Sequence, residues 1–167
     1  MTSREHSACF TGHRILPASQ MPELRTALEK QIRFLAGKGI TTFLAGGARG
    51  FDAFAAAAVL RIKESLPALR LVLVLPCPDQ DKGWPELDKA LHDEITRRAD
   101  GVITLFDEYA EGCMLQRNRF MVDNSIVCLA YYNRKKIGGG TYHTVTYAER
   151  QGVMLVNFYK VHTEDQV

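Results

Sequence analysis

Cysteine, net charge and long apolar runs are all scarce in this sequence, and each shortage excludes a class of protein. The four cysteines are scattered, with no CxxC pair and no pairing with histidine at metal-ligand spacing, so we expect reduced thiols that fill the core. A net charge of +2 attracts nucleic-acid phosphates weakly, so nucleic acid is not an expected partner. No apolar run reaches the roughly 20 residues of a membrane-spanning helix, so no membrane span is expected.

The remaining composition is that of an ordinary globular protein, with 46% hydrophobic and 24% charged residues. A length of 167 residues most simply predicts one domain, covering residues 1–167. The polar N-terminal residues lack the apolar centre of a signal peptide, which predicts a cytoplasmic protein. The acidic residues Asp107, Glu108 and Glu111 predict a solvated loop, and no metal site is expected.

Short apolar runs alternate with amphipathic segments along the chain. The runs predict strands at residues 8–11, 40–45, 69–75, 102–106, 125–131 and 153–158. A helix that ends near residues 37–39 is predicted by apolar residues at helical spacing, namely Leu24, Leu28, Ile32 and Leu35. Strands that alternate with helices predict an α/β three-layer sandwich with a mainly parallel sheet of about six strands.

A further helix is predicted to begin at Trp84 and Pro85, because proline is favoured in the first turn. Leu87, Leu91 and Ile95 recur at helical spacing and predict its buried face. Two interpretations of Trp84 stay open. It either stacks on a nucleobase or packs as a hydrophobic staple at the start of its helix.

Residues 46–52 form a glycine-rich turn between a predicted strand and a predicted helix. Such a turn lets backbone N–H groups approach an anion, and the helix N-terminus adds partial positive charge. The spacing matches neither GxGxxG nor GxxxxGK[ST]. Taken alone, the turn is explained equally well by tight chain reversal and by phosphate binding.

Three other loops follow predicted strands and carry related side chains. They contain Gly12, His13 and Arg14, then Arg117 and Asn118, then a glycine-rich start of a helix at residues 138–144. Right-handed crossovers bring such loops to one edge of the sheet, where ligands bind near the reversal of strand order. Guanidinium groups bind phosphate through two hydrogen bonds, so the loops together predict a site for one phosphorylated ligand.

The predicted ligand-binding residues are Gly12, His13, Arg14, Gly46, Gly47, Ala48, Arg49, Gly50, Asp52, Arg117, Asn118, Gly139, Gly140, Thr141 and Thr144. Some have a second interpretation. His13 either caps a turn or contacts the ligand. Asp52 either interacts favourably with the positive end of the helix dipole or binds a ribose hydroxyl. The basic run at residues 134–136 predicts a solvated turn.

The same motifs resemble, in order, those of the YpsA-like family of the SLOG superfamily. They are Phe10-Thr11-Gly12-His13-Arg14, residues 46–52, Arg117-Asn118 with Met121-Val122-Asp123, and Gly139-Gly140-Thr141. The resemblance covers nearly the whole chain. It implies a bacterial protein with a Rossmann-like fold that binds a nucleotide or nucleotide derivative of the ADP-ribose, NAD or nucleoside-phosphate type. The LOG-type phosphoribohydrolases and DprA-like DNA-processing proteins are more distant members of the superfamily.

LOG-type relatives cleave the N-glycosidic bond of nucleoside monophosphates and carry a pattern similar to PGGxGTxxE, whose glutamate serves the chemistry. Thr144 stands where that glutamate would fall, and a hydroxyl cannot act as a general acid or base near neutral pH. Glu149 lies too far along the helix to replace it. Asp52 is therefore the candidate catalytic residue, if a reaction occurs.

We therefore expect a sensor or regulator that binds a small nucleotide-type ligand and requires no cofactor. The alternative is a hydrolase that acts on an N-glycosidic or phosphate bond. A DprA-like DNA-interacting protein has less support, because the net charge is small. A homodimer is possible for this class.

Overall fold

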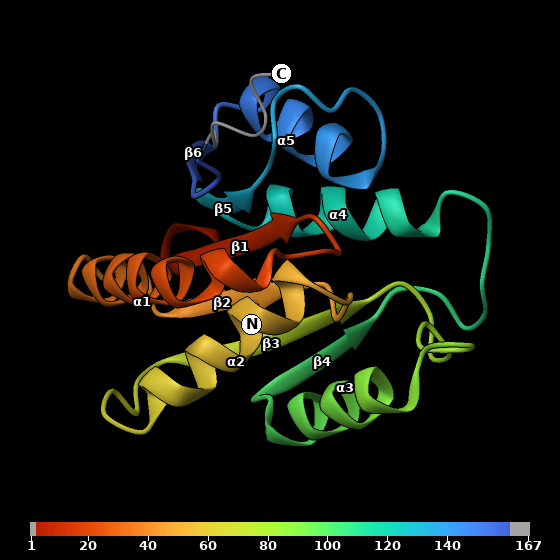
Figure 1. Ribbon diagram of the computed structural model, residues 1–167, viewed down its shortest axis with the longest axis horizontal. Helices are drawn as coiled ribbons and strands as arrows, with labels where there is room; N and C mark the ends of the chain where they lie inside the picture. Colours follow the sequence, from red (N-terminus) through yellow and green to blue (C-terminus); the bar gives the residue numbers. More distant parts are fainter. Residues whose placement is uncertain (1–2, 161–167) are drawn as a thin grey trace.

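The structure is a computed structural model of the chain that describes residues 3–160 (Figure 1). Within that range the chain forms one six-stranded sheet with the order β4-β3-β2-β1-β5-β6. Every neighbouring pair of strands is parallel, so the predicted sheet is confirmed and is parallel throughout. The strands are β1 (Ser7–Gly12), β2 (Thr42–Ala45), β3 (Arg70–Leu75), β4 (Gly101–Thr104), β5 (Val127–Tyr131) and β6 (Met154–Asn157).

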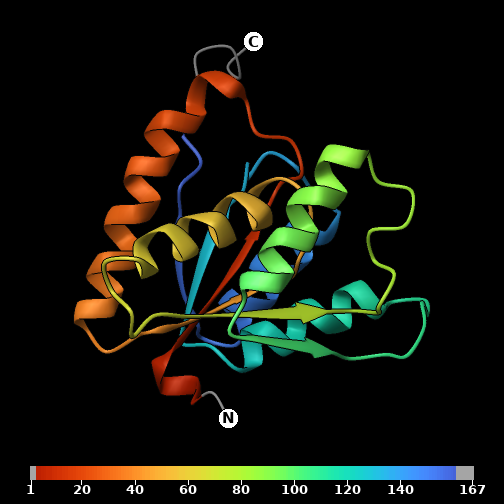
Figure 2. The ribbon, with the colours of Figure 1, turned by 90° about the horizontal axis from the view of Figure 1, so that it is seen from below.

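Helices cover both faces of the sheet and make the predicted third layer. They are α1 (Met21–Gly37), α2 (Phe51–Lys63), α3 (Glu86–Arg98), α4 (Cys113–Asp123) and α5 (Gly140–Arg150), with short 3-10 turns η1 (Arg4–His6) and η2 (Ala18–Gln20). On one face α2 packs between α1 and α3, and on the other α4 packs against α5. Figures 1 and 2 show these two helical layers on opposite sides of the sheet.

The strand order reverses direction once, between β1 and β5. The chain steps outward from β1 through β2 and β3 to β4, then returns past β1 to β5 and continues to β6. Right-handed crossovers place the helices of the outward half on one face and those of the returning half on the other. The loops that leave β1 and β5 therefore diverge and open a crevice at the carboxyl edge of the sheet.

The inner strands are buried on both faces, which explains why they appear in the sequence as unbroken apolar runs. Under α1 and α2, the ring of Phe10 stacks on Phe43 at 5.8 Å and meets Phe51 edge-on at 6.2 Å. The four leucine and isoleucine residues predicted to form the buried face of α1 are all buried, which confirms that helix. The four cysteines lie within the described residues and are buried and unpaired.

The predicted buried face of α3 is wrong for two of its three residues. Ile95 is 5% exposed, but Leu87 is 87% and Leu91 is 41% exposed. The helix is the outermost of its layer and packs against α2 on one side. Its apolar stripe therefore faces a cavity and solvent more than the core. Within residues 3–160, no helix is long and apolar enough to cross a membrane.

Candidate functional site

A cavity of about 290 Å³ lies at the carboxyl ends of β1 and β5, where the strand order reverses. We call it the loop cavity. Its predicted lining residues are Gly12, His13, Arg14, Ala48, Asp52, Arg117, Asn118, Gly139, Gly140 and Thr141. Gly138, from the predicted loop at residues 138–144, also lines it, and sequence reasoning missed three others, Thr11, Met114 and Lys136. The structure thus brings all four predicted loops to one crevice, whereas their role in binding a ligand stays a prediction.

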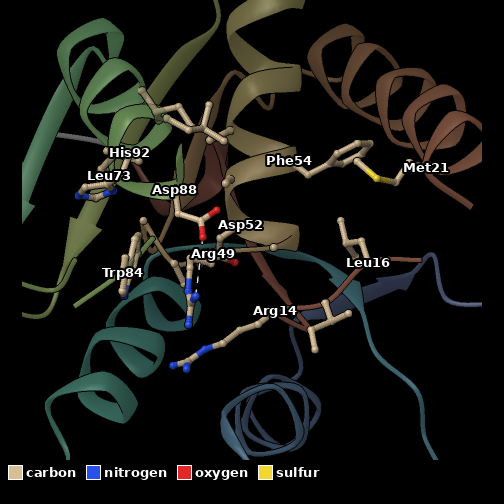
Figure 3. Close-up of a pocket in the computed structure, with 18 residues that line it drawn as sticks. Arg14, Leu16, Met21, Arg49, Asp52, Phe54, Leu73, Trp84, Asp88 and His92 are labelled. Atoms are coloured by element: carbon tan, nitrogen blue, oxygen red, sulfur yellow. Dashed lines mark ion pairs between the residues drawn. The ribbon is translucent and has the colours of Figure 1, made fainter. Parts of the chain in front are cut away.

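A second, larger cavity of about 510 Å³ opens beside the first, between α2 and α3 (Figure 3). We call it the helix cavity. Gly47, Arg49 and Gly50 line this cavity and not the loop cavity, so the glycine-rich turn contributes to both. Arg14, Ala48 and Asp52 line both cavities and form their shared wall. Sequence reasoning did not anticipate the helix cavity, because the apolar side of α3 predicted burial in the core.

Asp52 lies in the first turn of α2 and is buried, with 7% of its surface exposed. Burial raises the pKa of its carboxyl from 3.8 to about 6. The positive charge of Arg117 and hydrogen bonds from the backbone of Ala48 and Gly46 oppose that rise in pKa. The carboxyl at the shared wall therefore exchanges its proton close to neutral pH, as a general acid or base requires.

The Arg117 side chain projects from α4 and is buried, with 4% of its surface exposed. Its Nη1 donates to the carbonyl oxygens of Gly46 and Val74, and its Nε donates to Asn118 Oδ1 at 2.7 Å. Burial also lowers the pKa of the guanidinium. Its Nη2 contacts the thioether of Met114, which is a weak acceptor. The structure therefore uses most of these donors internally, and the predicted contact of Arg117 with phosphate rests on Nη2.

The close fit around Arg117 explains the glycine at position 46. A Cβ atom there would lie 2.6 Å from Arg117 Nη1 and 2.9 Å from an Asp52 carboxylate oxygen. Gly46 lines neither cavity and instead supplies the carbonyl that holds the arginine. Gly46 therefore seats Arg117 beside Asp52, and its contact with a ligand stays a prediction.

His13 fastens the loop after β1 to the loop after β5. Its Nε2 accepts a hydrogen bond from the backbone N–H of Asn133 at 2.8 Å, so the neutral ring carries its proton on Nδ1. Burial, followed by the charge of Lys136, lowers the pKa of this histidine. His13 therefore ties two loops together, and because the same ring lines the loop cavity, its contact with a ligand stays a prediction.

The start of α5 presents backbone N–H groups to the loop cavity. Gly139 is the N-cap residue at φ +87°, and the helix has neither a side-chain cap nor an acidic residue in its first turn. Arg14 and Lys136 line the same cavity and are exposed. Thr144 lines neither cavity, and its hydroxyl donates to the Gly140 carbonyl at 2.8 Å. It therefore braces the first turn of α5.

Replacing Gly50 with alanine is expected to lower the free energy of unfolding by about 2–4 kcal/mol. Gly50 adopts φ +78°, and a Cβ atom there would overlap the backbone of Arg14. Urea denaturation measures the loss. Gly83→Ala is the control, because Gly83 has φ +81° with no neighbour within 4 Å and should lose only about 1 kcal/mol. Equal losses in both variants would contradict the close approach of the two loops.

The sequence model of the YspA SLOG family (YpsA) matches residues 17–165. The chain belongs to this family. The UPF0398 protein BH1768 of Halalkalibacterium halodurans is 28% identical over 130 residues, which cover 77% of this chain and 69% of that protein. The UPF0398 protein YpsA of Bacillus subtilis is 25% identical over 130 residues, which cover 77% of this chain and 72% of that protein. The resemblance seen in the motifs is thereby confirmed.

The Rossmann-like fold of this SLOG protein is shared with a solved structure. DNA processing protein A from Helicobacter pylori, whose structure addresses its single-stranded DNA binding mode, superposes with a TM-score of 0.67 at 19% sequence identity. The superposition covers 94% of this chain and 66% of the other. The SLOG chain thus spans slightly less than two thirds of the length of that protein, and the likeness establishes the common fold.

Proposed function

We propose that this SLOG protein binds a nucleotide or nucleotide derivative, with its phosphate in the loop cavity, and acts as a sensor or regulator. The observation that carries the proposal is the glycine-capped start of α5, which faces the same cavity as the exposed cations Arg14 and Lys136. Unpaired N–H groups at a helix start, together with the helix dipole, favour a bound anion. Flexible cations at the rim supply charge-assisted hydrogen bonds to phosphate oxygens.

The buried Arg117 supports anion binding indirectly. An ionised Asp52 on the cavity wall would repel a phosphate, and the positive charge of Arg117 beside it offsets that repulsion. The raised pKa of Asp52 also reduces the fraction of ionised carboxylate near neutral pH. The cavity wall therefore repels an anion less strongly than a fully ionised, uncompensated Asp52 would.

A thermal-shift screen tests the proposal directly. AMP, ADP-ribose, NAD and cyclic nucleotides are each added to the protein, and at least one should raise the midpoint of unfolding in proportion to its affinity. Inorganic sulfate at the same ionic strength controls for effects of salt. Failure of every nucleotide to shift the midpoint beyond the sulfate control would contradict the proposal.

Arg14→Ala is expected to weaken binding of a nucleoside monophosphate by about 10- to 100-fold, because it removes a charge-assisted hydrogen bond. The affinity for the matching free nucleoside should stay almost unchanged. Calorimetry measures both affinities. Arg97→Ala serves as the control, because it removes the same charge from an exposed position of α3 outside both cavities. Equal losses for nucleotide and nucleoside would refute the phosphate contact.

A hydrolase is the second candidate function, and Asp52 is the observation that favours it. A carboxyl with a pKa of about 6 at the wall shared by two cavities is suited to protonate a leaving group or to activate water. Incubation with nucleoside monophosphates, followed by chromatography for released base or phosphate, tests this function. Release by the wild type that disappears in Asp52→Asn, with ligand affinity retained, supports the hydrolase. Binding without release supports the sensor.

A further inference from the structure

We propose that the helix cavity binds the base of the same nucleotide, a flat heteroaromatic ring joined through its sugar to the phosphate in the loop cavity. This inference rests on the proposed function and assigns the second part of one ligand. The size and apolar lining of the helix cavity suit a different chemical group from the phosphate proposed for the loop cavity.

The size and lining of the helix cavity suit an aromatic ring. Its volume of about 510 Å³ lies in the range of roughly 300–1,000 Å³ found for small-molecule sites. Figure 3 shows Trp84 and His92 on the side of α2 that faces α3, and Phe54 and Met21 on the side that faces α1. Apolar and aromatic lining residues, Trp84 among them, offer surface to a flat ring, whereas a phosphate or a free sugar gains little from them.

A small group of polar side chains converges on one end of this apolar cavity. The Arg49 guanidinium lies 5.5 Å from the centre of the Trp84 ring and 3.7 Å from the Asp88 carboxylate. The His92 ring meets Trp84 edge-on at 5.5 Å. Guanidinium donors and a carboxylate acceptor match the mixed donors and acceptors on the edge of a nitrogen base. An apolar cavity with a few convergent polar groups is the usual arrangement of a specific ligand site.

The two cavities adjoin at the place where a sugar would lie. Arg14, Ala48 and Asp52 line both, so a ligand with its phosphate in one and its ring in the other passes these residues. The small side chain of Ala48 leaves room at the shared wall. The carboxylate of Asp52 is an acceptor for sugar hydroxyl groups there. A nucleotide has this order of parts: ring, sugar and phosphate.

Trp84 is the only tryptophan of the chain and therefore reports on the helix cavity without labelling. Tryptophan emission and calorimetry are measured for AMP, GMP, CMP and UMP and for ribose 5-phosphate. At least one nucleotide should alter the emission and bind about 5- to 150-fold more tightly than ribose 5-phosphate, because stacking of its base adds to the phosphate contact. Ribose 5-phosphate should bind without changing the emission.

A matched pair of substitutions on α3 checks the location. Leu91 lines the helix cavity and is 41% exposed, so Leu91→Tyr narrows the cavity at a position that tolerates a larger side chain. It should reduce nucleotide affinity to about that of ribose 5-phosphate and leave ribose 5-phosphate binding unchanged. Leu87→Tyr is the control, because Leu87 lies one turn away, is 87% exposed and does not line the cavity. It should change neither affinity.

The outcomes separate this inference from the proposed function. If nucleotides and ribose 5-phosphate bind equally and the emission does not change, the base lies elsewhere and phosphate binding stands. If a nucleotide binds more tightly than ribose 5-phosphate but Leu91→Tyr and Leu87→Tyr have the same nucleotide affinity, the assignment of the base to the helix cavity is also overturned. If neither nucleotides nor ribose 5-phosphate bind, both proposals fail.

Discussion

Replacing Arg117 with methionine is expected to lower the free energy of unfolding by about 2–4 kcal/mol at neutral pH, because a buried carbonyl loses its donor and a buried carboxylate loses a nearby positive charge. Methionine fills much of the same volume, so the loss reports mainly on charge and hydrogen bonding. The substitution leaves the carbonyl of Gly46 without its donor and leaves the ionised Asp52 buried without a compensating charge. Urea denaturation near neutral pH measures the change.

The exposed Arg119 on the same helix provides the control for Arg117. Its guanidinium lies 5.3 Å from the centre of the Tyr147 ring, and Arg119→Met should cost about 1 kcal/mol or less. Adding Asp52→Asn to Arg117→Met should restore part of the lost stability, because it removes the uncompensated charge. Losses of similar size for Arg117→Met and Arg119→Met would show that the buried arginine does not support Asp52.

The second large effect is a dependence of stability on pH that belongs to Asp52. Its pKa is raised from 3.8 to about 6 in the folded protein, so the folded state holds this proton more tightly than the unfolded state. The resulting stability is fully present below pH 3.8 and is lost as the pH rises to about 6. A shift of this size corresponds to about 3 kcal/mol.

Asp52→Asn should remove that component of the pH dependence, since an amide does not titrate in this range. The free energy of unfolding is measured by urea denaturation between about pH 4 and about pH 7 for the wild type and the variant. The difference between the two curves isolates Asp52 from other titrating groups. Asp93→Asn changes an exposed carboxylate on α3 and should leave the slope of the wild type almost unaltered. Parallel curves for wild type and Asp52→Asn would contradict the raised pKa.

The sheet was predictable because its inner strands are buried on both faces and therefore stand out as apolar runs between turns. The helix containing Leu24, Leu28 and Ile32 was predictable for a related reason, since its apolar stripe meets the core. Helical spacing identifies an apolar face but not what that face meets. The residues Leu87 and Leu91 have the same spacing and face a cavity and solvent, and only the packing of α3 reveals this.

The gathering of the site loops was predictable from topology, because parallel strands deliver their following loops to one edge. The division of the site into two cavities was not. The internal partners of Arg117 are backbone carbonyls far away in sequence, which no motif records. Lys136 was missed because a basic run is usually solvated, whereas this one reaches the loop cavity at its last residue. The types of side chain at the site were thus evident from the sequence, but which cavity each side chain lines was not.

The limited burial of α3 has an evolutionary consequence. Within Glu86–Arg98 only Ile95 is buried, so substitutions at the exposed positions of the helix, other than to glycine or proline, should cost within about 0.5 kcal/mol of stability. The glycine-rich turn and its partner Arg117 are constrained differently, because Gly50, Gly46 and Arg117 each make close contacts with segments distant in sequence. Descendants of this protein can therefore diversify the wall formed by α3 while keeping the glycine-rich edge unchanged. Selection for a new ligand would act first on α3.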